Sequence, residues 1–350
     1  MRVYPSASSS AGLPAWLRHK PSVALLLGLA GFNLALWAYV LERHAHAPAL
    51  LGTAFLAWLL GLRHAVDPDH IAAIDNVVRK LMQQDTAPQA VGLFFSLGHS
   101  LVVLCAVGAL GLAGDAVKRH WNAMHELGGV IGTGVSALFL LLIALANLFI
   151  LRDLLGMFRG FREGRHLDHP RLEMLLQQRG LLARAFRSLF GLVGRSWHML
   201  PIGLLFGLGF DTASEIGLFV MAGDGISQGS GLLDVLLLPL LFMAGMTLID
   251  TTDSILMTRA YGWAYRDPLR KLWYNLGLTL LSVVLALGIG GVEALGLIAG
   301  KLQPDGRAWA WVGAANAALS RYGYLMIGLF VAAWLGSMLL FRWRRFARLG

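Results

Sequence analysis

The stretch Leu62-Arg63-His64-Ala65-Val66-Asp67-Pro68-Asp69-His70-Ile71 places one arginine, two histidines and two aspartates inside an otherwise apolar run. A charged group at the centre of a bilayer costs roughly 2.5–3.5 kcal/mol on insertion scales, so a chain that retains several of them has a use for them. Imidazole nitrogens and carboxylate oxygens spaced along one helix are ligands for first-row divalent metals. The stretch therefore predicts a polar site inside a membrane-spanning region, with a divalent metal ion as its ligand.

The composition of the chain supports a membrane location for this stretch. The 350 residues are 57% hydrophobic and only 14% charged, whereas about a quarter of the residues in a soluble domain are charged. We therefore expect an all-α, polytopic membrane protein. The net charge of +9 fits Lys and Arg in cytoplasmic loops better than a nucleic-acid partner. A single cysteine, Cys105, excludes an internal disulfide and any cysteine-based zinc site.

Apolar segments long enough to cross a core of roughly 30 Å predict eight transmembrane helices in a single bundle. They lie near residues 21–41, 49–77, 90–113, 127–151, 197–222, 232–258, 273–300 and 323–341. Lys and Arg are concentrated in alternate loops, which places both termini in the cytoplasm. The basic loop 152–196 then separates an N-terminal half, 1–151, from a C-terminal half, 197–350. Each half carries four of the expected helices.

On a straight helix, His64, Asp67 and Asp75 fall on one face. Pro68 lacks an N–H group and clashes with the carbonyl group of His64, so we expect a kink that frees this carbonyl oxygen and turns Asp69 inward. The alternative to a metal site is a purely structural role for these residues. In that case Arg63 and Asp67 form an ion pair, and the histidines form hydrogen bonds with neighbouring backbone groups. Asp75 lies near the expected end of the helix, so it is either part of this polar face or an ordinary helix-end residue.

Three further segments place polar groups inside apolar runs. Their polar residues are His99 in Phe95–Ser100, Asp211 and Glu215 in Leu208–Glu215, and Asp250 and Asp253 in Gly245–Asp253. Gly98 allows a close helix contact beside His99. The acids of the last two segments are spaced three or four residues apart, so each pair shares a helix face. We expect all of these groups to meet in one layer of the membrane.

The ligand types narrow the choice of metal. Carboxylates alone suit Mg²⁺, Ca²⁺ or Mn²⁺, whereas histidines favour Ni²⁺, Co²⁺ or Zn²⁺. No thiolate is available as a ligand, which argues against Cu(I). The sequence has no Gly-rich nucleotide-binding motif, so we expect secondary transport driven by the membrane potential. We expect the metal ion to be the transported substrate and no prosthetic group to be present.

These motifs resemble the nickel/cobalt transporter family (NiCoT) in order and in spacing, over nearly the whole chain. The resemblance rests on Arg63–Ile71, Phe95–Ser100, Leu208–Glu215 and Gly245–Asp253. It implies secondary transport of Ni²⁺, often with Co²⁺, through the cytoplasmic (inner) membrane, usually as high-affinity uptake. Two positions depart from the family pattern: Pro68 stands where alanine is usual, and Ser214 replaces the more common threonine.

The family hallmark for metal handling, His-x4-Asp-His, implies that His64, Asp69 and His70 take part in binding. We interpret His64, Asp67, His70 and His99 as the inner ligands in a tetragonal arrangement of nitrogen and oxygen. Asp69 and Arg63 would orient the imidazoles from outside this shell. The acids Asp211, Glu215, Asp250 and Asp253 would line the pathway or exchange protons.

Three alternatives remain beside nickel uptake. The first two are efflux of nickel or cobalt and transport of another divalent cation, because direction is not encoded in these motifs. An intramembrane metalloprotease is remote, since the His125–Glu126 pair is followed by Gly129 where His-Glu-x-x-His requires histidine. Membrane lipid is an expected partner and nucleic acid is not, while the sequence leaves the oligomeric state open.

Overall fold

The structure is a computed structural model that describes residues 19–84, 86–163, 193–209, 232–264 and 268–319, with the single residues 216, 328 and 332. Every element in these ranges is a helix, which confirms the all-α prediction. Several expected features lie outside the described residues, namely the eighth helix apart from two single residues, most of the loop 152–196, and Asp211 and Glu215 of the fifth helix.

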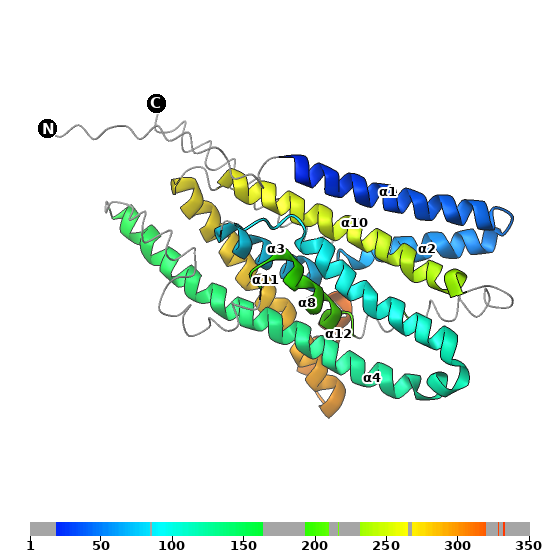
Figure 1. Cartoon of the computed structure of the whole chain (residues 1–350). Helices are drawn as coiled ribbons and strands as arrows, with labels where there is room; N and C mark the ends of the chain where they lie inside the picture. The colour runs from blue at the N-terminus through cyan, green and yellow to red at the C-terminus, as the bar shows by residue number, and fades with distance from the viewer. Residues whose placement is uncertain are drawn as a thin grey trace.

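Nine helical elements make up the described chain (Figure 1). They are α1 (His19–His44), α2 (Pro48–His64), α3 (Pro68–Gln83), α4 (Val91–Arg162), the short 3₁₀ helix η2 (Ser196–His198), α8 (Met199–Phe206), α10 (Leu232–Ala264), α11 (Pro268–Leu302) and α12 (Arg307–Leu319). The last of these forms where we expected a loop between the seventh and eighth transmembrane helices.

Within the described residues, five helical segments are long and apolar enough to cross a membrane, and a bent helix pair makes a sixth candidate. The five are Pro21–His44, Val91–Ala109, Glu126–Gly160, Leu236–Gly262 and Asn275–Leu302. Large apolar side chains of α1, among them Leu27, Leu34 and Leu41, are exposed on the outside of the bundle. Lipid covers such a surface in a polytopic membrane protein.

The bent pair corrects the expected single helix over 49–77. The chain forms two helices, α2 and α3, which meet at an angle of 52° across a short break. Pro68 is the first residue of α3, a position where its missing N–H group is no loss. The carbonyl oxygen of His64 is not freed as predicted, because it accepts a hydrogen bond from the backbone N–H of Asp67 at 2.9 Å.

The α4 element contains two of the candidate spans, and Figure 1 shows its path reversing between them. It ends at Arg162, beyond the expected end of the fourth transmembrane helix at residue 151. Helix α3 is enclosed by α4, α10 and α11, which all pack against it, and residues 70–82 of α3 are all buried. A short helix that begins inside the protein is therefore shielded from lipid along nearly its full length.

Glycines allow α4 and α8 to approach closely. A Cβ atom at Gly98 would overlap the backbone carbonyl of Leu200, and one at Gly203 would overlap the carbonyl of Phe95. Small residues permit such backbone approach in membrane proteins, where van der Waals packing replaces the hydrophobic effect between helices. The predicted close contact at Gly98 is confirmed, and it fixes the position of the neighbouring His99.

We predict that Gly98→Ala lowers the melting temperature of the purified protein in detergent, because α8 must move away from α4 to admit the new Cβ atom. Overpacking of this kind typically costs about 1–3 kcal/mol. Gly28→Ala is the matched control, because nothing lies within 4 Å of a Cβ atom at Gly28. Equal melting temperatures for the two variants would contradict the close packing of α4 on α8.

Candidate metal centre

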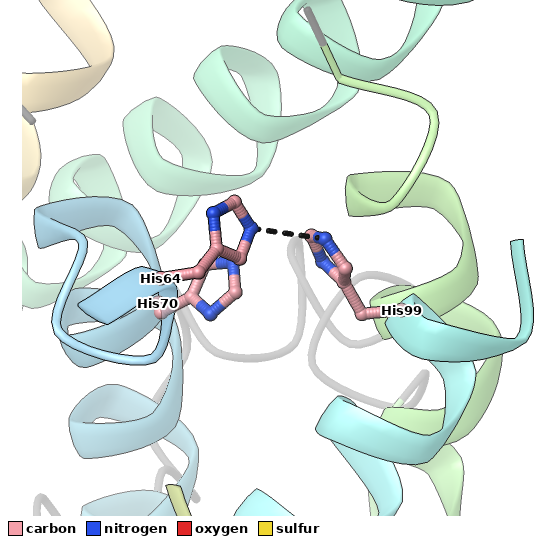
Figure 2. Close-up of side chains that lie close together, drawn as sticks. All are labelled: His64, His70 and His99. Carbon is pink, nitrogen blue, oxygen red and sulfur yellow. Dashed lines mark hydrogen bonds between the residues drawn. The ribbon is translucent and has the colours of Figure 1, made fainter. Parts of the chain in front are cut away.

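Three histidines from three helices meet in the interior of the bundle (Figure 2). His64 is the last residue of α2 and His70 lies in the first turn of α3, while His99 projects from α4. Their exposed fractions are 2%, 1% and 1% respectively. One potential ligand atom from each ring lies within 4.8 Å of the other two. The predicted convergence of the second and third transmembrane segments is thus present for these imidazoles.

The break between α2 and α3 brings His64 and His70 together. In one straight helix, residues six positions apart point about 120° away from alignment, because 3.6 residues make a turn. With the chain bent at residues 65–67, the two ring centroids are 4.8 Å apart, and each ring is also 4.8 Å from the ring of His99. The three rings therefore form a compact cluster that the unbroken helix would not allow.

The spacing of the imidazoles matches what one metal ion requires. The Nε2 atoms of His64 and His99 are 3.0 Å apart. Metal–imidazole bonds are roughly 2.0–2.1 Å long, so two nitrogens at right angles around one ion lie about 2.9 Å apart. The ligand nitrogen of His70 lies within 4.8 Å of the other two, so this ring moves inward if all three bind one ion. The arrangement is suited to a first-row divalent metal such as Ni²⁺, Co²⁺ or Zn²⁺.

Two carboxylates lie near the Nδ1 atoms of two of these rings. Asp67 Oδ2 lies 3.1 Å from His64 Nδ1, and Asp250 Oδ2 lies 3.8 Å from His70 Nδ1. A proton on Nδ1 that faces a carboxylate leaves the lone pair of Nε2 for a metal, which is the usual arrangement around metal-bound histidines. Both carboxylates are buried, so they act on the rings through a medium of low dielectric constant.

Each of these carboxylates is held by a further polar group. The guanidinium group of Arg63 lies 3.2 Å from Asp67 Oδ1, so the ion pair considered as the structural alternative exists alongside the histidine cluster. The hydroxyl group of Ser96 donates to Asp250 Oδ2 at 2.5 Å. Asp67, which we expected among the inner ligands, instead contacts the edge of His64 that faces away from His99.

The remaining predicted residues have different outcomes. Asp69 is half-buried, and its carboxylate accepts a hydrogen bond from the backbone N–H of His70 at 3.0 Å. In the first turn of α3, this negative charge also interacts favourably with the helix dipole. Asp253 has a buried Oδ2 atom and lies along α10 from Asp250. Asp211 and Glu215 fall outside the described residues.

Aromatic side chains form apolar walls around the histidines, a feature that the sequence analysis missed. The ring of Phe95 meets His70 edge-on at a centroid distance of 4.8 Å, and Phe242 lies 5.5 Å from His64. Phe206 continues the wall against Phe95. These rings keep water away from the site, which strengthens every charge interaction inside it. The position of Phe95 four residues before His99 is the one sequence signal for this wall.

Comparison with known proteins gives the family of the chain. The family model NicO, described as high-affinity nickel-transport protein, matches residues 50–340. The chain belongs to this family. It is 50% identical over 320 residues to the hydrogenase nickel incorporation protein HupN of Bradyrhizobium diazoefficiens, an alignment that covers 90% of this chain and 82% of the relative.

Two further relatives are named for the transport of nickel and of cobalt, respectively. The high-affinity nickel transport protein of Cupriavidus necator is 47% identical, over 94% of each chain. The cobalt transport protein NhlF of Rhodococcus rhodochrous is 39% identical, over 92% of this chain and 88% of the relative. No solved structure matches this chain. The chain is thus a multi-pass membrane protein of a nickel-transporter family and not an enzyme.

We predict that Asp67→Asn weakens the binding of Ni²⁺ to the purified protein. The substitution keeps the size of the side chain but removes the charge behind His64, and loss of such a partner typically lowers metal affinity by about 10–100-fold. Equilibrium dialysis with radioactive nickel measures the change. Glu126→Gln is the control, because Glu126 is an exposed carboxylate paired with Lys301. Unchanged affinity in Asp67→Asn would contradict the role of this carboxylate.

Proposed function

We propose that the protein is a secondary transporter that takes up Ni²⁺ through the cytoplasmic membrane, with Co²⁺ as a second substrate. The observation that carries the proposal is the buried cluster of three imidazoles within a helical bundle of this family. Nitrogen donors favour Ni²⁺ and Co²⁺ over Mg²⁺ and Ca²⁺, which prefer all-oxygen sites. The names of the relatives, which include both nickel and cobalt transport, agree with this choice.

In this proposal, His64, His70 and His99 are the protein ligands of the ion. Asp67 orients His64 and offers negative charge close to the metal, while Asp69 and Arg63 stabilise the bend that presents the ligands. Three protein ligands leave coordination positions for water or for a passing carboxylate. A site that is not fully enclosed by protein ligands binds the ion and still releases it, as transport requires.

We further propose that the chain crosses the membrane eight times and has both termini in the cytoplasm. The halves 1–151 and 197–350 each contribute four spans, joined by the basic loop 152–196. The asymmetry of Lys and Arg between alternate loops supports this orientation. The six candidate spans found in the described residues are compatible with eight in the full chain.

The membrane potential supplies the driving force in this account. A divalent cation that enters down 100 mV gains about 4.6 kcal/mol from its charge alone. Asp211, Glu215, Asp250 and Asp253 give the pathway the negative charge that makes it selective for cations. The acids replace part of the hydration shell that the ion loses on entering the bundle.

We predict that His99→Ala abolishes accumulation of radioactive nickel in cells that express the protein, and that His64→Ala and His70→Ala do the same. Each variant removes one of three nitrogen ligands. Cobalt should compete with nickel uptake more strongly than manganese does, because manganese binds nitrogen ligands more weakly. The matched control is His46→Ala, which changes an exposed histidine.

Normal uptake in His99→Ala, at equal protein abundance in the membrane, would contradict the assignment of this ligand. Less nickel in expressing cells than in cells without the protein would reject uptake and favour efflux. Stronger competition by manganese than by cobalt would reject a nitrogen-rich site.

A further inference from the structure

Two hydroxyl groups from neighbouring helices hold the carboxylate of Asp75, which lies midway along α3. Tyr261 of α10 donates to Asp75 Oδ1 at 2.7 Å, and Ser282 of α11 donates to Asp75 Oδ2 at 3.0 Å. All three residues are buried, and α3 continues beyond Asp75 as far as Gln83. Asp75 is therefore not an ordinary helix-end residue, because both of its oxygens accept hydrogen bonds inside the bundle.

A second set of hydrogen bonds fixes the next turn of α3 in a similar way. Arg79 donates to Thr279 Oγ1 of α11 at 2.7 Å and to Asn76 Oδ1 at 2.9 Å. Asn147 of α4 donates to the same oxygen of Asn76 at 2.6 Å. Thr279 and Ser282 are three residues apart, so they share one face of α11. Side-chain hydrogen bonds thus join α3 to each of the three helices that enclose it.

Helix α10 contacts α3 through two polar residues that lie on the same side of α10. Asp250 Oδ2 is 3.8 Å from His70 Nδ1, and the hydroxyl group of Tyr261 is bonded to Asp75. Asp250 and Tyr261 are eleven residues apart, which is close to three whole helical turns, so both side chains leave one face of α10. A sliding or a rotation of α3 against α10 therefore changes both contacts together.

The place of His70 in the histidine cluster depends on the orientation of α3. His70 lies in the first turn of α3, directly after the break at residues 65–67. Its ring centroid is 4.8 Å from those of both His64 and His99. Because the break interrupts the helix between His64 and His70, the packing of α3 on α4, α10 and α11 decides whether these distances are kept.

We propose that Tyr261 and Ser282 are positioning residues for metal binding, which act on His70 through Asp75 and helix α3. This inference rests on the proposed function, in which His70 is one of three protein ligands of the ion. Without the hydroxyl group of Tyr261, Asp75 Oδ1 loses the donor that ties α3 to α10. The position of α3 along α10 is then less well fixed, so His70 meets the other two imidazoles less often and the ion binds more weakly.

The affinity of the purified full-length protein for Ni²⁺, measured in detergent by equilibrium dialysis with radioactive nickel, tests this proposal. Tyr261→Phe removes only the hydroxyl group and keeps the buried ring. It should weaken nickel binding at least about tenfold, as the loss of a group that orients a metal ligand typically does. Tyr39→Phe is the matched control, because Tyr39 is exposed on α1, and it should bind nickel as the wild type does.

Uptake kinetics separate positioning from a loss of stability. In cells that express Tyr261→Phe, the nickel concentration for half-maximal uptake should rise, while the maximal rate per folded protein stays near that of the wild type. A role in stability alone lowers the melting temperature and the amount of active protein, and leaves the half-maximal concentration unchanged. That result, with unchanged nickel affinity in dialysis, would overturn the proposal.

A double-mutant cycle tests whether Tyr261 acts through Asp75. Asp75→Asn should also weaken nickel binding, and its effect should not add to that of Tyr261→Phe, because the two changes disrupt the same hydrogen bond. Additive effects would contradict the link between the two residues. Ser282→Ala removes the other donor, and it decides the matter by the same affinity measurement if Tyr261→Phe does not fold.

The proposed function fails or stands independently of these results. If His99→Ala abolishes nickel uptake while Tyr261→Phe and Ser282→Ala bind nickel as the wild type does, only the positioning role is rejected. If His99→Ala takes up nickel normally, the proposed function is rejected, whatever the affinity of the Tyr261→Phe variant.

Discussion

The break between α2 and α3 is the constraint on which the site depends. Residues 65–67 leave the helix between His64 and His70, and the 52° bend converts a sequence spacing of six into a ring distance of 4.8 Å. Pro68 makes the restart of the helix favourable because its fixed backbone angle suits a first helical position. Broken helices of this kind occur in membrane proteins where the irregular backbone is enclosed by protein, and here α4 and α10 enclose it.

Buried polar groups need partners from other parts of the chain, and several of those near the histidines have one. The carboxylates behind His64 and His70 are themselves held by Arg63 and Ser96. In the proposed account, a bound metal ion places its positive charge close to these carboxylates and so favours the arrangement that binds it. This coupling explains why the histidines and the acids lie in one connected interior rather than in separate, self-compensated pairs.

The sequence was sufficient to predict the all-α membrane fold, the convergence of His64, His70 and His99, and the close helix contact at Gly98. These features depend on local spacing and on the cost of charge in lipid. The sequence did not predict that Asp67 would lie behind His64 rather than beside the other imidazoles. That position depends on the break in the backbone, which the straight-helix projection ignored. The partners of Asp75 were also out of reach, since Tyr261 and Ser282 lie about two hundred residues away along the chain.

The central claim is that imidazoles from α2, α3 and α4 bind one ion together. X-ray absorption spectroscopy at the nickel edge, on purified protein loaded with one equivalent of Ni²⁺, tests this most directly. The account predicts three imidazole nitrogens at roughly 2.0–2.1 Å, and two in the His99→Ala variant. A shell of oxygens without imidazole scattering, or a spectrum that His99→Ala leaves unchanged, would contradict it.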